Sequence, residues 1–185
     1  MLYFECMKHF TDRLIEAIQK KKSIVCIGLD PQLDRIPAFL RKKFSGADAI
    51  FEFNKGIIDA VYDLVPIVKL QIAFYELLGS KGVEAFEKTL RYAESKGLLT
   101  IADAKRNDVG HTAEAYAEAF LGSGVFNADS VTVTPYLGWD SVKPFVEVAR
   151  KQGKGVFVLV KTSNQSSVDL QDLEMKDGNR VFEIM

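Results

Sequence analysis

The stretch "TIADAKRNDVGHTAEA", residues 100–115, joins a short apolar run to a segment with helical periodicity. The run "LLTIA" (98–102) is typical of a buried strand, and "TAEAYAEAFLGSG" (112–124) is typical of a helix. Two aspartates and a lysine lie between them within six positions: Asp103, Lys105 and Asp108. A strand that ends in polar residues and leads into a helix is the repeating unit of parallel α/β proteins.

The same alternation continues on both sides of this stretch. Short runs rich in β-branched residues recur at 23–29, 66–72, 98–102, 130–134 and 155–160. Segments of helical periodicity lie between them at 47–64, 82–97, 112–124 and 139–153. This order predicts parallel strands with crossover helices, and the nearly continuous apolar strands predict burial on both faces. Before the first strand, one helical face, made of Phe10, Leu14, Ile15 and Ile18, is expected to close the bottom of the domain.

Polar residues stand at the carboxyl ends of all five strand runs: Asp30, Lys69, Asp103 with Lys105, Thr134, and Thr162 with Ser163 and Asn164. A doubly wound open sheet and a (β/α)8 barrel both bind ligands at these ends. Only the barrel brings all five ends toward one point, and no Gly-rich dinucleotide motif follows the first strand. We therefore predict a (β/α)8 barrel, with residues 1–185 forming a single domain.

Composition limits the classes of partner. The chain has 185 residues, 48% of them hydrophobic, with 24 basic and 25 acidic residues, so it has no general attraction for nucleic acid or an anionic membrane. No apolar stretch reaches the ~20 residues needed to span a bilayer, and a signal peptide is not expected. We expect a cytoplasmic protein in which Cys6 and Cys26 are reduced thiols, since with His9 and His111 they make no zinc-type spacing.

The charged residues after the third strand favour one kind of chemistry. Asp103 and Lys105 are two positions apart in an extended segment, so they share a face, and Asp108 can return over them from the loop. Flanking carboxylates favour the charged form of a lysine, which disfavours a Schiff-base role for Lys105. An ammonium acid beside a fixed carboxylate suits decarboxylation, in which a carbanion collects a proton. A purely structural Asp–Lys–Asp ion-pair network remains open at this point.

Several segments resemble a known family: "GLDP" (28–31), "KLQIAFYELLG" (69–79), "DAKRNDVGHTA" (103–113), "AEAYAEAF" (113–120), "VTPYLGWDSVKPF" (133–145) and "VFVLVKTSN" (156–164). They resemble the longer bacterial subgroup of orotidine 5'-monophosphate decarboxylase, in the same order across residues 23–175. The resemblance implies a (β/α)8 TIM barrel of the ribulose-phosphate-binding type, usually a homodimer with a shared active site. It implies decarboxylation of orotidine 5'-phosphate to UMP in pyrimidine biosynthesis, with no metal and no cofactor.

The resemblance also implies catalytic roles. Lys105 would protonate C6 of the pyrimidine, and Asp103 would lie close to the departing carboxylate. Asp108 would reach the partner subunit's site together with Thr112 and contact the ribose.

Three further residues would bind the substrate. Asp30 and Lys69 would bind ribose hydroxyls, with Lys69 also holding Asp103 and Lys105. Ser163 would hydrogen-bond the pyrimidine.

The chain is shorter than a complete (β/α)8 barrel. A complete barrel takes ~250 residues and binds phosphate after strands seven and eight, whereas only five βα units are present here. We therefore expect a C-terminally incomplete barrel whose first and fifth strands have exposed edges and which binds the nucleotide poorly by itself. Two different functions are also possible for such a chain: a Mg²⁺-dependent sugar-phosphate enzyme of the same barrel superfamily, and a non-catalytic truncated remnant.

Overall fold

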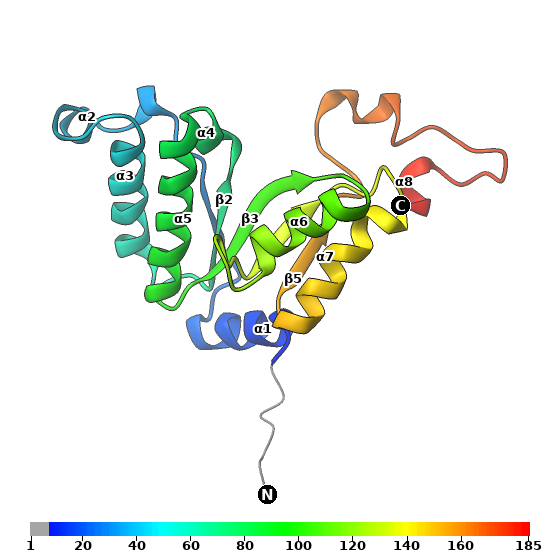
Figure 1. The fold of residues 1–185 in the computed structure, drawn as a ribbon, viewed down its shortest axis with the longest axis horizontal. Helices are drawn as coiled ribbons and strands as arrows, with labels where there is room; N and C mark the ends of the chain where they lie inside the picture. The colour runs from blue at the N-terminus through cyan, green and yellow to red at the C-terminus, as the bar shows by residue number, and fades with distance from the viewer. Residues whose placement is uncertain (1–7) are drawn as a thin grey trace, which may run out of the picture.

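The structure, a computed structural model, describes residues 8–185. Within these residues five parallel strands form one sheet in the order β1–β2–β3–β4–β5 (Figure 1). Their bounds are β1 Cys26–Leu29, β2 Ile67–Gln71, β3 Leu99–Arg106, β4 Ser130–Val133 and β5 Gly155–Val158. The predicted five βα units and the parallel α/β class are confirmed. The third strand is longer than the predicted run 98–102, because it continues through the charged residues.

Helices connect successive strands and cover one face of the sheet (Figure 1). Their bounds are α1 Phe10–Lys21, α2 Ala38–Lys43, α3 Gly46–Val61, α4 Ala73–Glu76, α5 Gly79–Ser95, α6 Gly110–Leu121, α7 Trp139–Gln152 and α8 Val181–Ile184, with short 3₁₀ turns at Leu33–Arg35 and Gln165–Asp169. The main core lies between the sheet and these helices. Its largest fully buried side chains are Tyr75, Phe86, Phe120 and Phe145. No helix among residues 8–185 is both long and apolar enough to cross a bilayer.

Burial differs between the middle and the borders of the sheet. The first six residues of β3 and all of β4 are buried, as predicted for strands covered on both faces. The same prediction is wrong for β1 and β5, in which only Leu29 is buried. Each of these two strands has a neighbouring strand on one side only within the described chain, so the predicted exposed edges are confirmed there.

Helix α1 covers the end of the sheet at which the strands begin (Figure 1). Phe10 is buried there against Ile67 and Leu99, so the predicted closing role of this helix is confirmed. Ile15 was predicted on the same face but is 53% exposed. The residues of α1 that pack with Phe10 are Leu14 and Ala17, so the packed face does not include Ile15. Of the two cysteines, Cys26 is free, and Cys6 lies outside the described residues.

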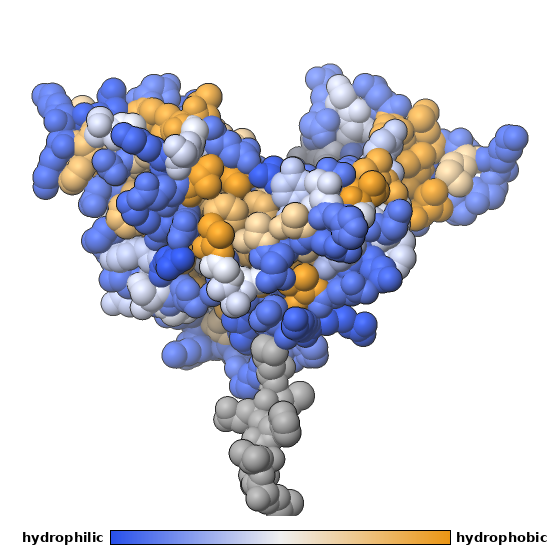
Figure 2. Space-filling model, viewed as in Figure 1, coloured by the Kyte–Doolittle hydropathy of each residue, from blue (hydrophilic) through white to orange (hydrophobic). Residues whose placement is uncertain are grey.

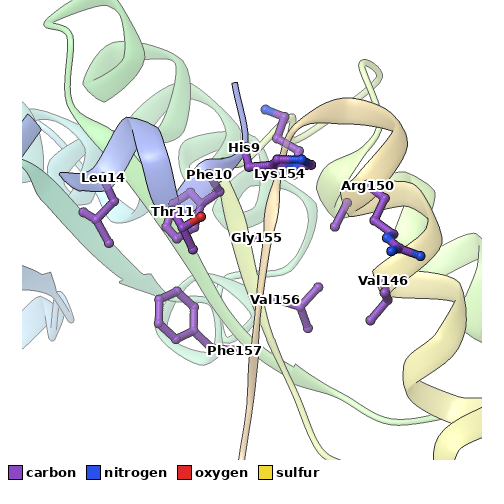
Figure 3. A pocket seen from close by; sticks show the side chains of 11 residues that line it. His9, Phe10, Thr11, Leu14, Val146, Arg150, Lys154, Gly155, Val156 and Phe157 are labelled. Atoms are coloured by element: carbon purple, nitrogen blue, oxygen red, sulfur yellow. The ribbon is translucent and has the colours of Figure 1, made fainter. Parts of the chain in front are cut away.

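A groove of about 420 Å³ lies between α1, α7 and the start of β5, as Figure 3 shows. Phe10 and Leu14 line it from α1, and Val146 and Val156 line it from α7 and β5. The groove is mostly apolar and lies where the strands begin, so it is separate from the strand ends at which polar residues were predicted to gather.

Candidate active site

The opposite end of the sheet carries the charged residues. Strand β2 pairs with β3 in a register that places Lys69 opposite Ile101 and Gln71 opposite Asp103. Alternate residues share a face, so the face that is apolar where these strands begin becomes polar where they end. The surface is hollowed at this end, between the lobe of α2–α5 and the lobe of residues 159–185 (Figure 2).

Asp103 is the centre of the cluster. One carboxylate oxygen, Oδ2, accepts hydrogen bonds from Lys69 Nζ at 2.9 Å and from Gln71 Nε2 at 3.0 Å. The other oxygen, Oδ1, accepts from Lys105 Nζ at 2.5 Å and from Thr132 Oγ1 at 3.0 Å. A carboxylate has about four acceptor positions, so this one is saturated and held in a single orientation.

The charge balance keeps Asp103 ionised. Burial acts to raise the pKa of its carboxyl, but hydrogen bonds from Lys105 and Lys69 outweigh burial and hold this pKa below its ordinary range. A saturated carboxylate of low basicity is a poor general base and a good fixed negative charge. Asp103 therefore orients the two ammonium groups.

The two lysines are partly exposed, unlike the carboxylate between them. The side chain of Lys105 is 45% exposed and that of Lys69 is 32% exposed, whereas the side chain of Asp103 is 8% exposed. An ammonium group has three N–H donors, and the contact with Asp103 uses one donor of each lysine. The remaining donors can bind an anionic group, and Lys105 can supply a proton to it.

Strand β3 is irregular at this point. Ala102 pairs with Val131 and Arg106 pairs with Val133, so Asp103, Ala104 and Lys105 together face the single residue Thr132. Lys105 has φ of 46°, in the left-handed region, where a non-glycine residue costs on the order of 1–2 kcal/mol. Strained backbone of this kind is concentrated at functional sites.

The predicted substrate-binding residue Asp30 joins the cluster. Its Oδ1 lies 3.8 Å from Lys69 Nζ, so Lys69 connects Asp30 after β1 with Asp103 on β3. Four of the seven predicted residues are therefore brought together: Asp30, Lys69, Asp103 and Lys105.

Among the described residues, the other three predicted residues make no hydrogen bond or ion pair with this cluster. The Asp108 carboxylate accepts a hydrogen bond from the N–H of Val109 at 2.8 Å. Thr112 is exposed in the first turn of α6, and Ser163 is exposed in the segment after β5. Within residues 8–185, no hydrogen bond joins any of these three to Asp103 or its lysines. Their predicted roles therefore stay predictions.

Two residues that bond to Asp103, Gln71 and Thr132, were not predicted from the sequence. The position of Gln71, two residues after Lys69 in a strand, was a usable signal, because such residues share a face. Thr132 had no comparable local signal, since its contacts arise from the irregular pairing of β3 with β4.

Residues 8–185 contain no group of three or more His, Cys, Asp or Glu side chains arranged to hold a metal ion. His111, the histidine nearest in sequence to the cluster, lies at 2.9 Å from Glu114 on the exposed side of α6.

A parallel sheet with helices on one face and charged side chains at its carboxyl ends defines the barrel-type α/β class. The family model described as "Orotidine 5'-phosphate decarboxylase / HUMPS family" matches residues 23–182. The chain belongs to this family.

Individual relatives agree with the family match. The "Orotidine 5'-phosphate decarboxylase" of Clostridium tetani is 47% identical over 175 residues, which are 94% of this chain and 60% of that protein. The protein of the same name from Petrotoga mobilis is 48% identical over 165 residues, 89% of this chain and 56% of the relative. This chain thus spans about 60% of the length of the curated relatives it matches.

A solved structure matches over the whole chain. It is the "putative orotidine 5'-phosphate decarboxylase" of Streptomyces avermitilis, with a TM-score of 0.86 and 38% identity over 100% of this chain and 65% of that one. The predicted barrel-type fold class is confirmed by this match.

Proposed function

We propose that this protein decarboxylates orotidine 5'-phosphate to UMP, as a carboxy-lyase of pyrimidine biosynthesis acting in the cytoplasm. The observation that carries the proposal is the Lys69–Asp103–Lys105 cluster at the carboxyl ends of β2 and β3. The names of the relatives support the choice of substrate. Residues 1–185 are proposed to act as one domain.

The chemistry follows from the placement of charge. When carbon dioxide leaves C6, the electron pair of the broken bond remains on that carbon as a carbanion without an electron sink. The Lys105 ammonium stabilises this charge more than it stabilises the bound substrate, and it then transfers a proton to C6. Asp103 lies beside the leaving carboxylate and holds Lys105 in place through the 2.5 Å contact.

The remaining residues are proposed to bind the nucleotide. Asp30 and Lys69, which lie 3.8 Å apart, bind ribose hydroxyls, and Ser163 contacts the pyrimidine. Asp108 and Thr112 act across a homodimer interface, on the ribose in the partner subunit's site. Thr112 is exposed, and within residues 8–185 neither residue is hydrogen-bonded to the cluster, which is compatible with this assignment.

The test is turnover of orotidine 5'-phosphate labelled with ¹³C in its carboxylate, with labelled carbon dioxide and UMP both measured. We expect release of both in equal amounts, and the same rate with EDTA present. Loss of activity with EDTA would instead favour a Mg²⁺-dependent sugar-phosphate enzyme.

A titration with UMP distinguishes a nucleotide-binding protein from a non-catalytic remnant. UMP binding without turnover would refute the decarboxylase proposal for this chain while leaving a nucleotide-binding role. Absence of both turnover and UMP binding would favour the non-catalytic remnant.

A further inference from the structure

Thr132 is a buried residue of β4, and it lies beside the irregular part of β3 in the sheet. Its hydroxyl makes two hydrogen bonds in opposite senses. It accepts from the backbone N–H of Lys105 at 2.9 Å and donates to Asp103 Oδ1 at 3.0 Å. A hydroxyl has one donor and two acceptor positions, so a single group can meet both demands.

The irregular strand creates the need for this side chain. Three residues of β3 face Thr132 alone, so regular pairing with β4 is interrupted between Ala102 and Arg106. The N–H of Lys105 points to the Thr132 hydroxyl, where a regular ladder would provide a backbone carbonyl. A buried N–H without an acceptor is costly, so the hydroxyl stabilises Lys105 at its φ of 46°.

The second bond of the hydroxyl fixes the carboxylate. Thr132 and Lys105 share Oδ1 of Asp103, while Lys69 and Gln71 share Oδ2. Thr132 is thus connected both to the backbone of Lys105 and to the carboxylate that Lys105 contacts. One hydroxyl therefore sets the backbone position and the side-chain partner of the same lysine.

We propose that Thr132 is a positioning residue for the decarboxylation, whose hydroxyl aims the Lys105 ammonium at the reacting carbon. The inference rests on the proposed function and extends it to a residue that does not touch the substrate. Misplacement of a catalytic group by about 1 Å can reduce the rate about 10²-fold. The hydroxyl, not the size or shape of the side chain, provides this role.

Three variants of the full chain separate the hydroxyl from general packing. Thr132→Val keeps the shape and removes both hydrogen bonds, whereas Thr132→Ser keeps the hydroxyl. Thr89→Val is the matched control, because it removes another buried threonine hydroxyl, which donates to the Ala85 carbonyl in α5.

The first measurement is by NMR and needs no turnover. Amide hydrogen exchange of Lys105 should become about tenfold faster in Thr132→Val, because its acceptor is lost. The Asp103 carboxylate should titrate at a higher pH in the same variant. Thr132→Ser and Thr89→Val should match the wild type in both. Wild-type values in Thr132→Val would overturn the inference.

The second measurement is steady-state kinetics. For Thr132→Val we expect kcat to fall about 10²-fold with KM nearly unchanged, and Thr132→Ser should recover most of the loss. An unchanged kcat in Thr132→Val would overturn the positioning role. A wild-type chain without turnover would overturn the proposed function instead, and the amide exchange would still decide whether Thr132 holds the irregular strand.

Discussion

Two buried aspartates stand at opposite ends of the same sheet, Asp103 where the strands end and Asp129 where they begin. Both accept hydrogen bonds from a basic side chain and from a threonine hydroxyl. Asp129 is bonded to Arg13 of α1 at 2.7 Å and to the backbone N–H and hydroxyl of Thr100 on β3.

The two clusters differ in what covers them. Helix α1 closes the cluster of Asp129, and the side chain of the neighbouring Lys154 is only 12% exposed. Burial holds the pKa of Lys154 below its ordinary range. At the other end the Lys105 side chain is 45% exposed.

The two clusters contain similar groups, but α1 closes one of them and the lysines of the other are partly exposed. Around Asp129 the charged groups use their hydrogen bonds to join α1 to β3 and to the turn before β5. Around Asp103 the carboxylate is saturated, but the ammonium groups keep donors free on the open side. Substitutions at the two ends should therefore affect different properties, stability at one end and turnover at the other.

The largest effect is expected at the open end. Lys105→Ala should reduce turnover of orotidine 5'-phosphate by about 10²–10⁴-fold, since this variant lacks the proposed proton donor. The midpoint of urea unfolding should change little, because this side chain is half exposed. The control is Lys143→Ala, which removes an exposed lysine on α7. Turnover retained in Lys105→Ala would refute its role as proton donor.

The second effect is expected at the closed end. Asp129→Ala should lower the free energy of unfolding by about 3 kcal/mol, because Arg13 loses its partner and the Thr100 N–H loses its acceptor. Urea denaturation measures this, with Asp63→Ala at an exposed position as the control. A loss as small as that of the control would show that the closed cluster does not stabilise the fold.

A third effect tests how closely α1 packs on the sheet. A Cβ added at Gly155 would lie 2.4 Å from Phe10 Cδ1, so Gly155→Ala should destabilise the protein by about 1–3 kcal/mol. Gly56→Ala in α3 is the matched control, because its Cβ would meet no atom within 4 Å. That control should be about 0.5–1 kcal/mol more stable than the wild type. Equal stability of both variants would contradict the close packing of α1.

The smallest effect is a pH dependence at the open end. The folded-state pKa of Asp103 lies below its unfolded value, so its contribution to stability is present above about pH 4 and is lost as the pH falls through the folded value. Unfolding free energies of the wild type and Asp103→Asn, measured from pH 6 to pH 3, should therefore converge toward the acid end. Parallel curves would indicate that the carboxylate is not stabilised by its lysines.

Local patterns in the sequence were sufficient for the order of the elements and for part of the site. Strand and helix periodicities depend on neighbouring residues, so the alternation was predicted correctly. The polar residues at the strand ends were also predicted, and Lys69, Asp103 and Lys105 do meet. Parallel pairing brings the carboxyl ends of neighbouring strands to the same edge of the sheet.

The tertiary structure determined the irregular strand pairing and the pattern of burial. The irregular pairing that sets Thr132 against three residues of β3 depends on a contact between strands far apart in the chain. The exposure of Ile15 and of the border strands depends on which surfaces another element covers. Sequence periodicity shows which face of an element is apolar, but only packing determines whether a neighbour covers that face, because burial is a property of contacts distant in sequence.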